Sequence, residues 1–89
     1  MAIEFDPPKR DWTLANRGLD FARCDEVFAG RHVTAEDLRE DYGEHRFISA
    51  GHLDGRLVVV VWTPCEGGRR IISMRKANDR EKTRYSREL

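Results

Sequence analysis

The residues best suited to chemistry fall into two groups, and the larger one lies near the C-terminal end of the sequence. It begins with the run Arg69-Arg70-Ile71-Ile72-Ser73-Met74-Arg75-Lys76 and continues into a segment that holds Arg80, Lys82, Arg84 and Tyr85. Between positions 69 and 87 there are eight lysine or arginine residues and only two acids. Such a density of positive charge is typical of a surface that binds a polyanion. The competing interpretation is a solvated strand end and helix face, which is what a charge run usually is.

The second group is the segment Asp41-Tyr42-Gly43-Glu44-His45-Arg46, which combines a carboxylate, an imidazole and a guanidinium. Cleavage of RNA without a metal ion needs a base for the 2′-hydroxyl, cationic donors for the charge that grows on the phosphate, and an acid for the leaving oxygen. The candidates are Glu44 or His45 for the base, Arg46 with Arg75 for the donors, and Lys76 or Tyr85 for the acid. The alternatives are a solvent-facing histidine at a strand edge and a structural tyrosine.

Composition limits the other classes of function. The 89 residues, 39% hydrophobic and 36% charged, predict one globular domain over residues 1–89. The formal net charge of zero conceals an uneven distribution, because residues 1–45 carry a net charge of −5 and residues 46–89 a net charge of +5. Only the second half is therefore expected to meet phosphate.

No metal, cofactor or membrane is expected. Cys24 and Cys65 lack the spacing of a disulfide framework or a zinc site, and no zinc-protease, phosphate-loop or dinucleotide motif occurs. The sequence has no apolar run long enough to span a membrane and no signal peptide. These features predict a cytoplasmic protein.

The elements that must position the two groups follow from hydrophobic spacing. A short strand is expected at residues 2–5, a first helix at about Pro8–Asn16, and a second helix from Asp20 to near Gly30 with a buried stripe of Phe21, Cys24, Val27 and Phe28. Three strands are expected at Arg46–Leu53, Arg56–Thr63 and Arg69–Lys76, with a hairpin turn at Asp54-Gly55.

The middle strand is apolar on both faces and is expected at the centre of the sheet. Asn78 and Glu81 form a capping-box pattern that opens a terminal helix. Strict alternation along the last strand would put Arg69, Ser73 and Arg75 on one face and Arg70 and Lys76 on the other. The predicted fold class is α+β, a small antiparallel sheet with two N-terminal helices and a C-terminal helix.

A set of motifs runs through nearly the whole chain. It consists of Phe5-Asp6-Pro-x-Lys9, Gly18-x-Asp20-Phe21, Val27-Phe28, Asp41-Tyr42-Gly43-Glu44-x-Arg46, Gly51, Gly55-Arg56-Leu57, Thr63, Arg70-Ile71-Ile72-Ser73-x-Arg75-Lys76-Ala77, Glu81 and Tyr85. With these motifs in this order, the chain resembles the BrnT family of toxins. The most specific part is the basic strand followed by the glutamate and the tyrosine.

The resemblance implies a RelE-like fold, inhibition of translation by RNA cleavage, and neutralisation by a BrnA-like antitoxin. Expected partners are that antitoxin, in a toxin–antitoxin heterotetramer of two plus two chains, the RNA substrate, and operator DNA only through the antitoxin. By position, the functional polar residues of the family fall on Glu44, Arg46, Arg75, Lys76 and Tyr85. The side chains expected to contact RNA are His45, Arg56, Arg70, Arg80 and Arg84, with a structural role as the alternative for Arg56 and Arg70.

The sequence departs from the family where the usual Asn-x-x-Lys-His-Gly stretch has Asn16 and Arg17 before Gly18. If the missing histidine contributes to catalysis, weaker activity or another substrate is expected. Trp62 and Met74 also replace residues that are usual in the family, and both are interpreted as changes in packing. The rival hypothesis is a non-enzymatic module that binds nucleic acid or antitoxin in autorepression. It is motivated by the absence of a clearly identifiable nucleophile or base.

Overall fold

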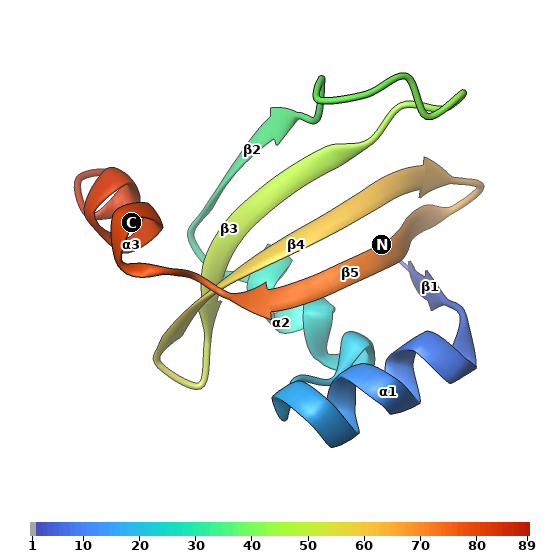
Figure 1. Ribbon diagram of the computed structural model, residues 1–89, viewed down its shortest axis with the longest axis horizontal. Helices are drawn as coiled ribbons and strands as arrows, with labels where there is room; N and C mark the ends of the chain where they lie inside the picture. Colours follow the sequence, from blue (N-terminus) through green and yellow to red (C-terminus); the bar gives the residue numbers. More distant parts are fainter. Residues whose placement is uncertain (1) are drawn as a thin grey trace.

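A five-stranded mixed sheet forms the centre of the protein (Figure 1). The computed structural model describes residues 2–89. Its elements are β1 (Ala2–Phe5), α1 (Pro7–Arg17), the 3-10 helix η1 (Phe21–Arg23), α2 (Cys24–Ala29), β2 (His32–Glu36), β3 (Phe47–Leu53), β4 (Arg56–Cys65), β5 (Gly68–Lys76) and α3 (Asp79–Tyr85). The strands lie in the order β1-β5-β4-β3-β2, with β1 parallel to β5 and the other pairs antiparallel.

The central strand β4 is buried on both sides, as its apolar run predicts. Val58 and Val60 face the main core, where they pack with residues of η1 and α2, whereas Val59 faces a smaller cluster with Leu57, Ala50 and Ala77. We call the first side of the sheet the core face. We call the second side the open face, because Ile48, Val61 and Ser73 are only half-buried there.

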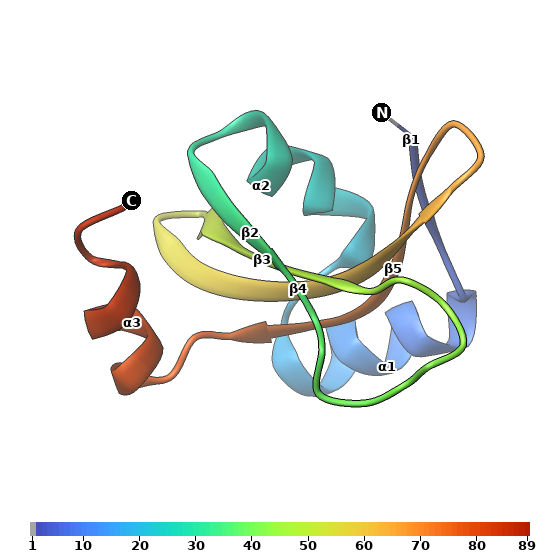
Figure 2. The ribbon, with the colours of Figure 1, turned by 90° about the horizontal axis from the view of Figure 1, so that it is seen from above.

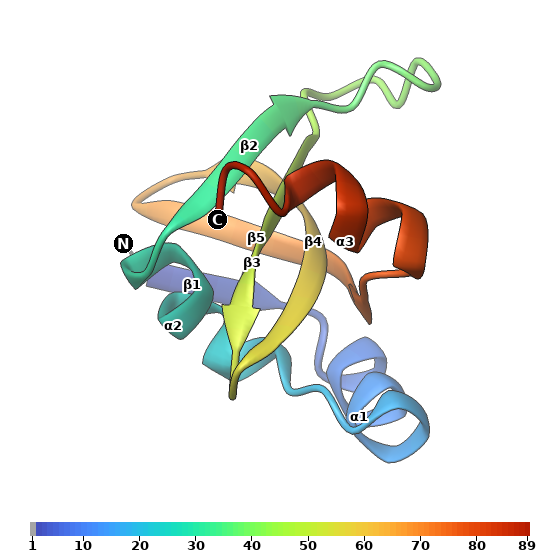
Figure 3. The same cartoon turned by 90° about the vertical axis from the view of Figure 1, so that its left-hand side faces the viewer.

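Two helices, α1 and α2, lie on one side of the sheet, and α3 lies beyond one of its ends (Figure 1). In Figure 1, α1 and α2 lie below the sheet, and α3 lies beyond the end at which β5 finishes. Seen from above (Figure 2), the segment that joins β2 to β3 lies toward the opposite end from α3. Figure 3 views the strands from the end where α3 lies, and α1 and α2 again share one side. The open face therefore runs between α3 and the β2–β3 segment.

Local sequence explains the turns and helix ends. Asp54 and Gly55 have φ of 53° and 73°, so the predicted hairpin turn is confirmed. The first helix begins at Pro7 and ends where Gly18 adopts φ of 69° and donates its N–H to the Leu14 carbonyl at 3.0 Å. The capping box is also confirmed, because the Asn78 side chain accepts from the Glu81 N–H at 2.8 Å and the Glu81 side chain accepts from the Asn78 N–H at 3.0 Å.

A β-bulge divides β5 into two halves. Val61 pairs with Ser73 but the next residue, Trp62, pairs with Ile71, so Ile72 has no partner of its own on β4. The bulge lets Ile71 and Met74, three residues apart, both enter the main core, with 2% and 0% of their surface exposed. It therefore changes which side chains of β5 reach each face.

The predicted fold is wrong in two respects, although the structure is α+β. The expected small antiparallel RelE-like sheet is mixed, because β1 pairs in parallel with β5, a partner some 66 residues away in sequence. A side chain at Gly68 would overlap the backbone of Ala2, so this glycine permits the approach.

The second of the two expected N-terminal helices is also not a single helix. The Asp20 side chain accepts the Ala22 N–H at 2.9 Å, and the Arg23 N–H bonds to the Asp20 carbonyl at 3.0 Å, which closes a 3-10 turn first. Only six residues of α2 follow. No helix in the described residues is long and apolar enough to cross a membrane.

The β-bulge predicts that Ile71 and Ile72 contribute unequally to the free energy of unfolding. Ile71→Ala should lower the free energy of unfolding by about 2–5 kcal/mol, because it leaves a cavity in the main core. Ile72→Ala removes a half-buried side chain at the bulge and should cost clearly less. Urea denaturation of both variants measures the difference, and equal losses would contradict the observed register.

Candidate functional site

Arg75 lies at the centre of a charged cluster on the open face. It stands opposite Val59 on β4, and both side chains lie on that side of the sheet. Its two terminal nitrogens donate to the Glu81 carboxylate at 2.6 and 2.8 Å. The capping box fixes Glu81 in the first turn of α3, so this ion pair connects the last helix to the last strand.

Electrostatics within the cluster tie further residues to Arg75. The bond from Arg75 lowers the pKa of Glu81 to about 2, so this carboxylate is ionised at neutral pH. The bond to Glu81 raises the pKa of Arg75, whereas desolvation and the positive charge of Arg39 act in the opposite direction. Arg39 therefore lies close enough for its charge to act on Arg75.

Arg46 forms a second centre at the other end of the open face. Its guanidinium lies over the Tyr42 ring, 4.0 Å from the centroid, and donates to Oε1 of Glu44 at 3.3 Å. The second carboxylate oxygen of Glu44 makes no hydrogen bond to the described residues 2–89. About half of the Glu44 side chain, 44%, is exposed. A substrate could therefore reach this carboxylate.

The β2–β3 segment is held in place by Asp37. The side chain of Asp37 is 1% exposed and accepts hydrogen bonds from Arg39, at 2.7 and 2.8 Å, and from the Tyr42 hydroxyl at 3.2 Å. The bond from Arg39 lowers the pKa of Asp37 to about 2. The Asp37 N–H also bonds to the Arg46 carbonyl at 2.7 Å, which continues the β2–β3 ladder. The segment is thus ordered by one buried carboxylate.

Arg70 is the third arginine of the open face. It pairs with Thr63 on β4 and with Glu4 on β1, and its side chain forms an ion pair with the Glu4 carboxylate. The register places Phe47, Trp62 and Ile71 in one row, so Arg46, Thr63 and Arg70 form the adjacent row on the opposite side. Arg46 and Arg70 consequently project from the same face.

Arg46 and Arg75 lie near one another on the open face but are not in contact. The row of Arg46 lies four residues of β3 away from the row of Arg75, which is about 13 Å along the strand. The structure therefore brings Arg46, Arg70 and Arg75 onto one face without joining Glu44 directly to Arg75. Side chains as long as arginine can converge over Val61 and Ser73, which lie between these rows.

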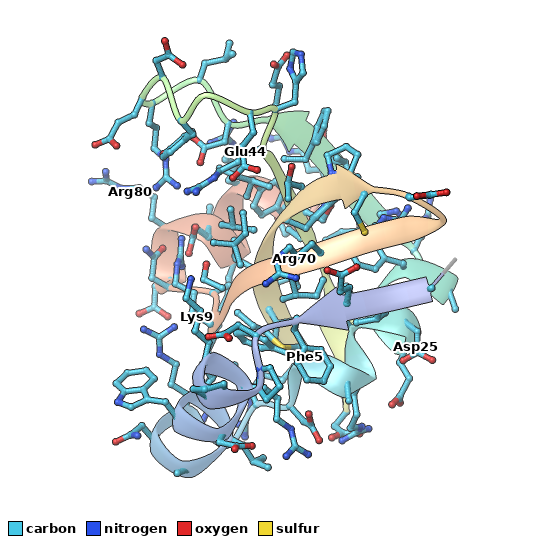
Figure 4. All side chains as sticks on the ribbon, turned by 90° about the vertical axis from the view of Figure 1, so that its right-hand side faces the viewer. Phe5, Lys9, Asp25, Glu44, Arg70 and Arg80 are labelled. Carbon is cyan, nitrogen blue, oxygen red and sulfur yellow. The ribbon has the colours of Figure 1, made fainter. Side chains whose placement is uncertain are left out.

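The other predicted site residues lie elsewhere or at the margins. Lys76 pairs with Val58 and projects toward the core face, away from Arg75. His45 is 80% exposed, with Nδ1 3.0 Å from Glu36, and Arg56 is exposed at the hairpin. Arg80 and Arg84 are exposed on α3, and Tyr85 packs partly against the small cluster of the open face. In Figure 4, Glu44 and Arg80 lie in the upper half of the view, Arg70 lies between, and Lys9 and Phe5 lie lower.

The predicted alternation along β5 is wrong because the bulge interrupts it. Arg69 does not share a face with Arg75. Its guanidinium lies on the core face, 4.0 Å from the Phe28 ring centroid and 4.8 Å from that of Trp62. Its Nε is buried and has no hydrogen-bond partner in the described residues. Arg69 is therefore part of the packing between α2 and the sheet.

Sequence reasoning missed two members of the Arg75 cluster. Glu81 was recognised only as a helix cap, and nothing in its spacing from Arg75 indicated an ion pair. Arg39 belongs to an acidic segment, where the neighbouring charges gave no sign of a cationic site. Both contacts depend on how α3 and the β2–β3 segment fold back over the sheet.

The open face can bind an anion by exchanging ligands. Each of its arginines Arg46, Arg70 and Arg75 already has a carboxylate partner, in the pairs Arg46–Glu44, Arg70–Glu4 and Arg75–Glu81. A phosphate could replace or share these carboxylates, because guanidinium groups bind either ion in the same forked geometry. Among residues 2–89, no group of three or more histidine, cysteine, aspartate or glutamate residues is placed to hold a metal ion.

Comparison with known proteins gives one family. A family model described as a ribonuclease toxin, BrnT, of type II toxin–antitoxin systems matches residues 5–81. The matched range runs from the last residue of β1 to the first turn of α3 and includes all three arginines of the open face. No curated protein matches the sequence.

The ion pair between Glu81 and Arg75 predicts a pH-dependent contribution to stability. Because folding lowers the pKa of Glu81 from 4.5 to about 2, its contribution is complete above about pH 4.5 and disappears as the pH falls toward 2. Glu81→Gln should therefore be less stable than the wild type at pH 7, and the difference should shrink between pH 5 and 2. Urea denaturation across this range measures it.

Asp79→Asn is the matched control, since it removes a fully exposed carboxylate from the same helical turn. A difference between wild type and Glu81→Gln that stayed constant from pH 7 to pH 2.5 would show that the charge of Glu81 is not what stabilises α3.

Proposed function

Because this chain belongs to the BrnT family of ribonuclease toxins of type II toxin–antitoxin systems, we propose that it cleaves RNA on the open face of its sheet. The observation that carries the proposal is the grouping of Arg46, Arg70 and Arg75 on one face, bordered by Arg80 and Arg84 of α3. An extended polyanion crossing this face would meet cations from β5, from the residue just before β3 and from α3.

We propose a reaction that needs no metal ion. The 2′-hydroxyl oxygen attacks the adjacent phosphorus and gives its proton to a base, while the bond from phosphorus to the 5′-oxygen breaks. An acid returns a proton to that oxygen, so the products are a 2′,3′-cyclic phosphate and a 5′-hydroxyl end. Guanidinium groups bind the negative charge that accumulates on the phosphate oxygens during this exchange.

Glu44 is a better candidate for the base than Glu81. A general base works best when its pKa is near the working pH, and Glu81, with a pKa of about 2 and both oxygens bound to Arg75, is too weak. Glu44 is half-exposed and has one oxygen free of bonds to residues 2–89. His45 remains the alternative base, although its ring is 80% exposed and next to Glu36.

Tyr85 is the better candidate for the acid. Its side chain packs against the small cluster of the open face, whereas Lys76 projects toward the core face. Arg46 and Arg75 would then hold the phosphate above Val61 and Ser73, with Arg39 adding a further positive charge. In this arrangement Arg70, Arg80, Arg84 and Arg56 contact neighbouring phosphates along the RNA.

The partner of this chain is a protein antitoxin, as in other type II systems. We propose that the antitoxin is BrnA-like, that it covers the open face, and that two toxin and two antitoxin chains assemble into a heterotetramer. Operator DNA would be bound only through the antitoxin. Free toxin in the cytoplasm would cleave RNA and so inhibit translation.

A binding role without catalysis is the second candidate. The observation that favours it is that Glu81, the carboxylate bound to Arg75, has both oxygens occupied and a pKa lowered to about 2, so it is a poor base. In that case the protein alone would bind operator DNA in a salt-sensitive manner and leave RNA intact.

The decisive experiment is incubation of the purified toxin with a defined RNA oligonucleotide in the presence of EDTA. Cleavage to products ending in 2′,3′-cyclic phosphate is expected, and purified antitoxin should stop it. Arg75→Ala and Arg46→Ala should each lower kcat about 100-fold, the usual cost of removing one donor to a transition-state oxyanion. Glu44→Gln should abolish the acidic limb of the pH profile of kcat/KM.

The matched control is Arg31→Ala, which removes an exposed arginine just before β2 without touching the open face. Each variant must be fully folded at the assay temperature before rates are compared, because Arg75→Ala also loses the ion pair with Glu81. Intact RNA, or cleavage that EDTA abolishes, would contradict the proposed reaction.

A further inference from the structure

A second surface suited to nucleic acid lies beside the free edge of β5. Trp12 of α1 is 55% exposed, although large aromatic side chains are usually buried. The guanidinium carbon of Arg17 lies 5.3 Å from the centroid of the Trp12 ring. The side chains of these two residues thus form an exposed aromatic and cationic pair.

Arg17 fixes this pair to the end of β5. The parallel pairing of β1 ends at Phe5 and Ile71, so residues after Ile71 have no strand beside them on this edge within the described chain. The Nη1 of Arg17 donates to the Met74 carbonyl at 2.9 Å and satisfies one of the backbone groups left open there. Trp12 is therefore held next to the basic end of the strand.

A hollow of about 400 Å³ separates α1 from this edge. It is lined by Asn16, Arg17, Arg75 and Lys76. Within residues 2–89, neither Arg17 nor Lys76 has a carboxylate at ion-pair distance, in contrast to the arginines of the open face. Arg75 lines the hollow and also belongs to the open face, so the two surfaces adjoin.

We infer that this hollow is a subsite for a nucleotide next to the cleaved bond, with its base stacked on Trp12 and its phosphate bound by Arg17 and Lys76. Stacking on an exposed aromatic ring beside cations is how single strands are bound without sequence-specific hydrogen bonds. The uncompensated charges favour a phosphate over a protein segment as the ligand. The inference rests on the proposed ribonuclease function and extends it to the substrate beyond the reacting phosphate.

The test measures binding of a fluorescent 2′-O-methyl RNA hexamer, which cannot be cleaved because its attacking oxygen is blocked. Trp12→Ala should weaken binding about 5- to 100-fold, the range that stacking of one base supports, and Trp12→Phe should retain most of it. Lys76→Ala should lower the slope of log Kd against the logarithm of the salt concentration by about 1, which corresponds to the loss of one phosphate contact. With cleavable RNA, Trp12→Ala should raise KM and leave kcat nearly unchanged.

Leu14→Ala is the matched control, because it truncates another exposed apolar side chain of the same helix. Thermal unfolding of each variant separates loss of binding from loss of structure, which matters for changes at Arg17.

The outcomes separate this inference from the proposed function. If the wild type cleaves RNA and Trp12→Ala binds the hexamer as tightly as the wild type, the subsite is wrong and the function stands. If Trp12→Ala weakens only the antitoxin complex, the surface is a protein interface and the subsite is again wrong. If the wild type neither cleaves nor binds RNA, both proposals fail.

Discussion

The register shift between β4 and β5 determines which side chains of β5 face each side of the sheet. The main core requires Ile71 and Met74 on the same side of the sheet, which regular alternation over three residues forbids. The extra residue at Ile72 resolves this conflict. As a result, Arg70, Ser73 and Arg75 share the open face, while Arg69 is packed between Phe28 and Trp62 on the other side. Packing of the core thus selects which cations are available for binding.

Carboxylates hold the arginine side chains of the open face in place. Glu81, positioned by the capping box, orients Arg75, and Glu44 orients Arg46 over Tyr42. An exposed pair such as Arg46–Glu44 adds little to stability, but both pairs can fix the guanidinium groups until a phosphate replaces the carboxylates. The buried Asp37 does the same for Arg39 and orders the whole segment between β2 and β3. An ordered yet paired set of arginines is consistent with a toxin that binds a polyanion and also a protein partner.

Much of this fold could be predicted from sequence, because short-range signals determined it. The Asp54-Gly55 turn, the Asn78–Glu81 capping box, the central position of β4 and the start of α1 after Asp6 all depend on neighbouring residues. The parallel pairing of β1 with β5 and the bulge at Ile72 could not, since each arises from contacts across the folded chain. The 3-10 turn after Asp20 is local, but an aspartate before an apolar stripe is equally a signal for a regular helix. Because of the bulge, strict alternation groups Arg69 with Arg75 in place of Arg70. Arg39 could not be predicted, because it reaches Arg75 only through the way the β2–β3 segment folds. The resemblance to a family supplied the function, whereas the geometry separated the candidate residues by face.

An NMR titration of the arginine Nε–H resonances with a 2′-O-methyl RNA dinucleotide would show which face of the sheet binds the anion. The resonances of Arg46, Arg70 and Arg75 should shift together along one binding curve, while that of Arg69 stays unchanged because its guanidinium is packed against aromatic rings. A shift of Arg69 without Arg46 and Arg75 would place the anion on the core face and rule out binding by the open face.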